Sequence, residues 1–220
     1  MAKRFLVWGG GGHGKVVAEL IRALGHEVCG FADADPAKLG QQVEPGGARV
    51  VTLEDQLLHL LSAEKRLPDG LDAVALAVGG NSARMRCFDR LGHLHVPQLV
   101  HPTSVVSSTA CIGRGSVVFP RAVINPDARI ESAVIINTGA IIEHDCRVED
   151  GAHISPGVVL AGGVQIGAGA WIGAGATVIQ GIRVGAGSIV GAGAVVIENV
   201  PEGSTFVGVP AKNIQARGSR

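Results

Sequence analysis

The densest group of side chains able to do acid–base chemistry lies in the second half of the chain. Glu143, His144 and Asp145 follow one another, so the histidine stands between two carboxylates. Nearby negative charge stabilises the imidazolium and a carboxylate fixes the tautomer, which suits a general base working near neutrality. The alternative is a solvated surface histidine, but the surrounding run of apolar residues and glycines favours the functional interpretation.

His153 follows nine residues after His144, and His101 lies at the edge of the same region. Three histidines around an interface form the zinc site of the β-helix carbonic anhydrases of the gamma class. Such a site needs a pair of histidines on neighbouring turns of the β-helix. The spacing of His101, His144 and His153 does not supply that pair, so we expect no metal. Cys146 follows Asp145 but is expected to point inward, so it is a poor nucleophile candidate.

A second group of candidate residues lies near the N-terminus, where residues 9–14 read GGGGHG. Gly9, Gly11 and Gly14 fit G-x-G-x-x-G, and Asp33 follows about twenty residues further on. Glycines let the backbone approach a phosphate, and the following helix N-terminus attracts its charge. A dinucleotide spans two mononucleotide halves of such a fold, whereas residues 1–98 supply only one. We therefore expect a nucleotide diphosphate rather than NAD, with a turn that binds nothing as the remaining alternative.

The elements that carry the acid–base group are short and periodic. An aliphatic residue recurs at every sixth position, without a break: Ile112, Val118, Ile124, Ile130, Ile136, Ile142, Val148, Ile154, Leu160, Ile166, Ile172, Val178, Val184, Val190, Val196. Helices need a period near 3.6 and ordinary strands a period of 2, so a period of six predicts a parallel β-helix. Each hexad supplies one strand and one turn, with glycine or a small residue at the tight corner.

The first part of the chain has the pattern βαβαβα, which predicts a small parallel sheet with helices on both faces. The expected strands are residues 4–8, 27–32 and 71–78. The expected helices are residues 15–24, 53–61 and 81–91, with Thr52 and Asn81 as caps of the second and third. The predicted organisation is an α/β half-Rossmann-like domain over 1–98, an all-β prism over 99–200, and a C-terminal cap and tail over 201–220.

Composition limits the classes of partner. Basic and acidic residues number 19 each, so the net charge of zero argues against nucleic acid and anionic membranes. No run of apolar residues is long enough for a membrane span, and the N-terminal MAKRFLVWGG leads into an expected strand rather than a signal peptide. The four cysteines form no CxxC, which indicates free thiols in a reducing cytoplasm.

Together these features resemble a known family along nearly the whole chain. The GxxGHG loop on a half-size nucleotide fold, the unbroken hexads, the N-T-x-x-x-I-E-H-[DE]-C segment from Asn137 and the terminal FVGVPAK look like the bacterial sugar-nucleotide N-acetyltransferases. This family includes the bacillosamine-pathway and perosamine enzymes and is related to sialic acid O-acetyltransferases. The general rule for parallel crossovers favours a right-handed prism, whereas the resemblance implies a left-handed β-helix.

The resemblance implies a homotrimer that uses acetyl-CoA to acetylate the C4 amine of a nucleotide-linked 4-amino-4,6-dideoxy sugar. His144 matches the general base and Asp145 the acidic residue that raises its basicity, with Glu143 beside them. The positions that match substrate-binding residues are Gly12, His13, Gly14, Asp33 and Gly79, and Asn137 is a further candidate for substrate binding. Those assigned to the coenzyme are His153, Ala174, Ala192 and Lys212, the last of which is otherwise a solvated tail residue.

Several questions remain open at the level of sequence. Many relatives have Asp-Asp after the second strand, whereas this chain has Asp33-Ala34-Asp35, so GDP, UDP and dTDP all remain candidates. Trp171 is expected on an outer position of the prism, where it would cover an interface. The rival functions are a sugar O-acetyltransferase, an NAD-dependent redox enzyme and a trimeric scaffold without catalysis.

Overall fold

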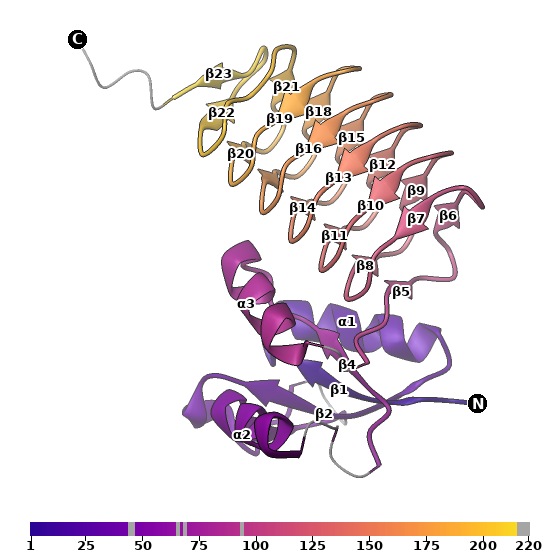
Figure 1. Cartoon of the computed structure of the whole chain (residues 1–220), viewed down its shortest axis with the longest axis vertical. Helices are drawn as coiled ribbons and strands as arrows, with labels where there is room; N and C mark the ends of the chain where they lie inside the picture. The colour runs from indigo at the N-terminus through magenta and orange to yellow at the C-terminus, as the bar shows by residue number, and fades with distance from the viewer. Residues whose placement is uncertain (44–46, 65–66, 68–69, 93–94, 215–220) are drawn as a thin grey trace. The chain divides into compact units, whose positions relative to one another are not determined.

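The computed structural model describes residues 1–220 except 44–46, 65–66, 68–69, 93–94 and 215–220. The chain forms two compact units, Met1–Leu99 and Val100–Arg220. The first unit carries helices on a parallel sheet, and the second is a stack of short strands (Figure 1). Among the described residues, no helix is both long and apolar enough to cross a membrane.

The first unit is built on one parallel sheet with strand order β3-β2-β1-β4. Its strands are β1 (Arg4–Trp8), β2 (Glu27–Asp33), β3 (Val50–Leu53) and β4 (Ala73–Leu76). Its helices are α1 (Gly12–Ala23), α2 (Glu54–Glu64) and α3 (Asn81–Leu91), with a 3-10 turn at Pro36–Lys38. Helices α1 and α2 lie on opposite faces of the sheet (Figure 1). Strand β1 is therefore buried from both sides, which explains its continuous apolar run.

This unit differs from the sequence prediction in several places: α1 begins at Gly12 rather than residue 15, and β4 is shorter than the predicted strand over residues 71–78. Strand β3 was missed, because Val50–Leu53 is a short edge strand that runs directly into α2. The prediction that Thr52 caps α2 was wrong, since Thr52 lies within β3 and the helix begins at Glu54. The prediction that Asn81 caps α3 was also wrong: Gly80 occupies the N-cap, and the Asn81 side chain accepts a hydrogen bond from Arg84 instead.

The second unit is a triangular prism whose two-residue strands pair with the strands one coil before and after. Sheet I contains β5 (Leu99–Val100), β8 (Val117–Val118), β11 (Ile135–Ile136), β14 (His153–Ile154), β17 (Trp171–Ile172), β20 (Ile189–Val190), β22 (Thr205–Val207) and β23 (Lys212–Asn213). Sheet II contains β6 (Val105–Val106), β9 (Val123–Ile124), β12 (Ile141–Ile142), β15 (Val159–Leu160), β18 (Thr177–Val178) and β21 (Val195–Val196). Sheet III contains β7 (Cys111–Ile112), β10 (Arg129–Ile130), β13 (Arg147–Val148), β16 (Gln165–Ile166) and β19 (Arg183–Val184).

The second residue of nearly every strand points inward and builds one continuous apolar core. The series begins two hexads earlier than the sequence prediction, since Val100 and Val106 are in phase and pack against that core. At the other end the chain leaves the repeat, and Phe206 and Ala211 are buried in the same core. The inward residues thus stabilise the prism along its whole length.

Glycine is needed at the corners for two separate reasons: a positive φ at one position and close packing between coils at another. From Gly115 to Gly193 every sixth residue has a positive φ, and most of these residues are glycine. Glycines directly after the aliphatic position serve close packing instead. A Cβ at Gly167 would lie 2.5 Å from the backbone nitrogen of Ala186 on the next coil, and a Cβ at Gly173 equally close to that of Ala192.

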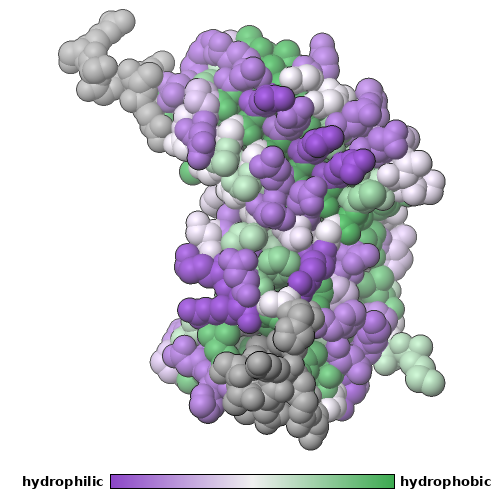
Figure 2. Space-filling model, in the orientation of Figure 1, coloured by the Kyte–Doolittle hydropathy of each residue, from purple (hydrophilic) through white to green (hydrophobic). Residues whose placement is uncertain are grey.

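The first residue of each strand points away from the core. The three faces of the prism differ in the residue types at this position. Sheet III exposes mainly polar side chains: Cys111, Arg129, Arg147, Gln165, Arg183. Hydrophilic residues predominate on the side of the prism visible in Figure 2. Sheet II turns out an almost unbroken column of β-branched apolar side chains: Val105, Val123, Ile141, Val159, Thr177, Val195.

Candidate active site

His144 lies at the corner between β12 on sheet II and β13 on sheet III. Its Nδ1 atom is 2.7 Å from Oδ2 of Asp145, and the two side chains are 63% and 65% exposed. When Nδ1–H donates to the carboxylate, the lone pair of Nε2 is left to accept a proton. The pair is therefore arranged as a solvent-accessible base with a fixed tautomer.

The electrostatics of this corner favour the protonated imidazole. The hydrogen bond that Asp145 accepts is the main cause that raises the pKa of His144 above its ordinary value. Desolvation acts in the opposite direction, and the charges of Asp145 and Glu143 add smaller contributions to the rise. A raised pKa means a stronger base, whose proton-accepting form becomes dominant only at a higher pH than for a free histidine.

The residue type at position 145 departs from the repeat, although its backbone conformation follows it. The φ of Asp145 is +61°, at a corner position that most hexads give to glycine. Aspartate tolerates the left-handed region better than most residues, and such conformations cluster at functional sites. The amide of Asp145 donates to the carbonyl of Pro126 on the preceding coil at 3.1 Å. The corner thus carries a carboxylate, held next to the imidazole, where the fold alone would favour glycine.

Cys146 is fully buried in the prism core beside this pair. Its Sγ donates to the carbonyl of Ala161 at 3.2 Å, and burial raises the pKa of the thiol to about 11. A thiol with that pKa stays protonated near neutrality, so the side chain packs and does not attack.

A largely apolar groove of about 450 Å³ runs along sheet I and its corner toward sheet II. The rings of His153 and Trp171 stack in it, with centroids 5.7 Å apart and planes inclined by 4°. Trp171 Nε1 donates to Ser155 Oγ at 2.9 Å. Ala174 and Ala192 line the same groove. Three of the four residues predicted for the coenzyme therefore lie together.

The fourth, Lys212, is not among the residues that line this groove, and its Nζ lies 2.8 Å from Glu198 Oε1. Asn137, predicted for the sugar substrate, lies beside the groove: its Nδ2 is 3.2 Å from His153 Nε2. Trp171 was predicted to cover an interface, but its place in the groove was missed. The sequence did hold a signal, because Trp171 follows His153 by eighteen residues and so pairs with it on the next coil.

Within one chain the histidine corner and the groove are separate. His144 lies at the corner of sheets II and III, whereas Ala174 and Ala192 lie at the corner of sheets I and II. Sheet II stands between them, so one prism alone does not bring the predicted base to the predicted coenzyme groove. No three His, Cys, Asp or Glu side chains gather as metal ligands would in the described parts of the chain.

In the first unit, the glycine-rich segment 9–14 runs into the first turn of α1, and its glycines differ in the space around them. A Cβ on Gly9 would clash with the backbone of Ala77, and one on Gly14 with the carbonyl of Gly9. These two glycines are needed by the fold itself. A Cβ on Gly11 or Gly12 would meet nothing within 4 Å. The open side of the loop is therefore where a phosphate could approach the backbone.

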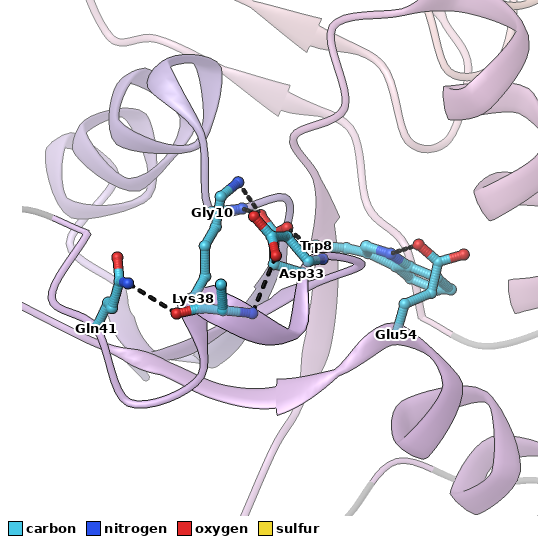
Figure 3. A network of polar contacts seen from close by, with 8 residues as sticks. Trp8, Gly10, Asp33, Lys38, Gln41 and Glu54 are labelled. Carbon is cyan, nitrogen blue, oxygen red and sulfur yellow. Dashed lines mark hydrogen bonds and ion pairs between the residues drawn. The ribbon is translucent and has the colours of Figure 1, made fainter.

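Asp33, at the end of β2, is the centre of the polar network beside this loop (Figure 3). Its Oδ2 accepts from the Gly10 amide at 2.8 Å and from Lys38 Nζ at 2.9 Å, while its Oδ1 accepts from the Asp35 amide. Burial alone would raise the pKa of Asp33, but these hydrogen bonds bring it below the ordinary value. The carboxylate is thus ionised and held in place beside the loop.

A pocket of about 500 Å³ opens beside Asp33 and is lined by Trp8, Glu54, Arg86 and Arg90, among others. The Trp8 Nε1 atom lies 3.4 Å from Glu54 Oε2 (Figure 3). Carboxylates and guanidinium groups on an apolar wall can hydrogen-bond both donors and acceptors of a nucleobase.

His13 and Gly79 lie in the same unit but differ in exposure. Burial, with a contribution from the charge of Arg84, lowers the pKa of His13 to about 4, so this imidazole is neutral near pH 7. Gly79 is exposed, and a Cβ on it would meet nothing within 4 Å. The Gly79 carbonyl accepts from the buried Arg84 guanidinium at 3.1 Å. Arg84 was missed by the sequence reasoning, because nothing in its spacing marks a buried arginine.

Comparison with known proteins agrees with both units. The PglD N-terminal domain model matches residues 4–91, and the bacterial transferase hexapeptide model (six repeats) matches residues 127–162 and 163–198. A histidine-to-alanine variant of GDP-perosamine N-acetyltransferase from Caulobacter crescentus, solved with CoA and GDP-perosamine, is 38% identical, with 95% of each chain covered and a TM-score of 0.84. The chain belongs to the hexapeptide-repeat sugar-nucleotide N-acetyltransferases.

Other members of this family support the assignment. The acetyltransferase domain of PglB from Neisseria gonorrhoeae FA1090, solved with acetyl coenzyme A, is 36% identical, with a TM-score of 0.86, covering 97% of this chain and 100% of that one. The UDP-N-acetylbacillosamine N-acetyltransferase of Bacillus subtilis (strain 168) is 39% identical over 121 residues. The chain spans 51% of the length of that curated relative. The family also settles the hand of the prism, which is a left-handed parallel β-helix.

Proposed function

We propose that the chain transfers the acetyl group of acetyl-CoA to the C4 amine of a nucleotide-linked 4-amino-4,6-dideoxy sugar. The observation that carries this proposal is the His144–Asp145 pair, an exposed base with its tautomer fixed at 2.7 Å, on a prism that also carries an apolar groove. The relatives solved with CoA and GDP-perosamine, and with acetyl coenzyme A, support the two substrates.

In this mechanism the two units have different tasks. The open backbone at Gly11 and Gly12 and the fixed carboxylate of Asp33 hold the nucleotide diphosphate part of the sugar substrate. The groove around His153 and Trp171 holds acetyl-CoA, whose pantetheine arm suits an apolar wall. Binding energy from these remote parts positions the amine and the thioester for reaction.

The chemical step needs one proton transfer. The neutral amine attacks the thioester carbonyl, and His144 accepts the amine proton through Nε2 as the C–N bond forms. Asp145 stabilises the imidazolium that results. When the C–S bond breaks, the imidazolium returns the proton to the departing thiolate, so the base is regenerated and CoA leaves as a thiol. No covalent intermediate with the enzyme is required.

We infer further that the active assembly is a homotrimer. The β-branched column on sheet II supports this, because a partly exposed apolar face of that length is better covered by a partner. A neighbouring prism would also bring a second copy of the groove toward the His144 corner, which one chain alone does not do. Light scattering at micromolar protein tests the inference: a three-fold mass is expected, and a monomer would contradict it.

We also place the reaction in the cytoplasm, as a step of polysaccharide biosynthesis. All four cysteines are free, including the exposed Cys111, which fits a reducing compartment. Acetyl-CoA as the acetyl donor fits the same compartment.

The proposal is tested by following thiol release from acetyl-CoA with GDP-, UDP- and dTDP-linked 4-amino-4,6-dideoxy sugars. Turnover with one of these amino sugars and none with its 4-hydroxyl analogue is expected. Faster turnover of the hydroxyl analogue would indicate an O-acetyltransferase. Binding of a nicotinamide dinucleotide in place of sugar nucleotides, or no thiol release with any sugar, would contradict the proposal.

A further inference from the structure

Gly162, at a corner of the prism, departs from the residue pattern of the other corners, and it lies next to His144. Consider the residue two places after each inward aliphatic residue of the series 112–190. In all hexads but one, this residue carries a side chain. These residues are Arg114, Pro120, Pro126, Ser132, Thr138, His144, Asp150, Pro156, Ala168, Ala174, Gln180, Ala186 and Ala192. Only Gly162 lacks a side chain in this series, and it lies one coil after His144.

The backbone does not require glycine at this place. The left-handed φ of this corner, +69°, belongs to Gly163 and not to Gly162. The corner also makes the same inter-coil hydrogen bonds as the others: Gly163 N donates to His144 O at 2.9 Å, and Gly181 N donates to Gly162 O at 3.0 Å. Since alanine occupies the equivalent place at Ala168, a methyl group is compatible with this backbone.

The space beside Gly162 is filled by the imidazole of His144. A Cβ built on Gly162 would lie 2.7 Å from His144 Nε2 and 2.8 Å from His144 Cε1. Real Cβ atoms do not come so close to other heavy atoms, so an added methyl group would move the ring. The atom that it would meet first is the nitrogen assigned to proton transfer.

We propose that Gly162 is a positioning residue of the reaction, whose missing side chain lets the His144 ring lie against the next coil while Nδ1 stays on Asp145. This inference rests on the proposed function. The ring is held from two directions, by the carboxylate of Asp145 at one nitrogen and by the glycine surface at the other edge. Gly162 touches neither the amine nor the thioester in this role, but it sets where Nε2 lies.

The exposure of His144 determines what a substitution will do. Because its side chain is 63% exposed, the ring can swing into solvent instead of straining the prism. Gly162→Ala should therefore leave the thermal unfolding midpoint and the trimer unchanged. It should lower kcat by roughly 10²-fold, the loss expected when a reacting group is misplaced by about an ångström. Ala168→Gly changes one methyl group at the equivalent corner, with no histidine above it, and should keep wild-type kcat.

A double substitution separates positioning from a structural effect. In a His144→Ala background, Gly162→Ala should cost no further activity, because the ring that it displaces is already gone. A further tenfold loss in that background would show that Gly162 acts independently of His144, and would overturn the proposal. Wild-type kcat in the single Gly162→Ala variant would overturn it as well.

An NMR titration of the His144 imidazole tests the geometry without any turnover. Asp145 and Glu143 are the charged groups that raise the pKa of this ring. Displacement by the new methyl group should weaken the bond to Asp145, so the His144 pKa should fall in Gly162→Ala relative to wild type and stay unchanged in Ala168→Gly. An unchanged pKa in Gly162→Ala overturns the positioning role. Absence of acetyl transfer in the wild type, with the pKa shift present, would contradict only the proposed function.

Discussion

The two units of this chain place their candidate site residues by different means. In the first unit, Asp33 is fixed by donors from two segments: Gly10 in the glycine-rich segment, and Asp35 and Lys38 in the 3-10 turn. In the prism, His153 and Trp171 meet because they are eighteen residues apart, one coil of the repeat. The first unit is thus an irregular polar network at the ends of strands. The second is a regular lattice on which a few positions depart from the rule.

This difference indicates a division of labour. A polar pocket with lysine, arginine and open glycine backbone suits recognition of a charged, variable ligand such as a nucleotide. A rigid prism suits chemistry, because each corner is held by hydrogen bonds to the coils before and after it. We expect substitutions in the first unit to change substrate affinity and those at the prism corner to change the rate of the chemical step.

The largest change in kcat is expected from a substitution of His144, at the prism corner. His144→Ala should lower kcat by roughly 10²–10⁴-fold, the usual range for loss of a positioned base. The core of the prism is untouched, because His144 is exposed, so trimer mass and both substrate affinities should persist. Steady-state kinetics with each substrate varied in turn, together with isothermal titration, would measure these quantities. A kcat near that of the wild type would mean that the enzyme acts mainly by positioning.

A bulky residue in the glycine-rich segment should weaken substrate binding rather than lower kcat. Gly12→Leu fills the open side of the loop, and should raise the KM for the sugar nucleotide by about 10²-fold, or about 2.7 kcal/mol, with the acetyl-CoA KM nearly unchanged. Gly14→Leu is the matched control: its side chain would meet the Gly9 carbonyl, so it should lower the unfolding midpoint. An equal rise of both KM values in Gly12→Leu would break the division between the units.

A substitution in the groove on sheet I should weaken the binding of acetyl-CoA, although the groove belongs to the prism. Trp171→Ala removes the ring that stacks on His153, and should raise the KM for acetyl-CoA by roughly tenfold, the equivalent of about 1.4 kcal/mol. The sugar-nucleotide KM should stay within about twofold of wild type. Ile189→Ala, on the next coil of the same groove, serves as a milder comparison. A loss of trimer in Trp171→Ala would instead support the earlier expectation that this side chain covers an interface.

Asp145→Asn should give the smallest loss, within about tenfold in kcat, because the base remains and only its partner is weakened. Asp145 raises the pKa of His144, so its neutralisation should move the ionisation that controls kcat to lower pH. The pH dependence of kcat in the two proteins measures this shift. A shift to higher pH would mean that the carboxylate does not act on His144 as the geometry indicates.

The regularity of the prism also explains what the sequence could predict. The hexads fixed the places of His144, Ala174 and Ala192, because residues six and eighteen positions apart have a known relation in such a fold. Register could not predict contacts that depend on rotamers, such as the ring of His144 over Gly162.

The first unit was harder to predict, because its contacts join residues without a period. The ion pair of Lys38 with Asp33 follows from a 3-10 turn that no hydrophobic pattern marks. Strand β3 is short, lies at the edge of the sheet and borders a helix, so Thr52 and Leu53 were assigned to the helix and Val50 and Val51 to no element. The glycine-rich segment was recognised, but only the three-dimensional packing distinguishes Gly9 and Gly14, which the fold needs, from Gly12, which faces open space.

The central claim is that His144 is the base that accepts the amine proton. The pH dependence of kcat for the wild type and for His144→Ala, with both substrates saturating, tests it most directly. Because Asp145 raises the pKa of His144, the wild-type rate should climb with pH through an ionisation above the ordinary value of 6.5 and then level off. That limb should vanish in His144→Ala. The same limb in both proteins would contradict the account, since the titrating group would then not be His144.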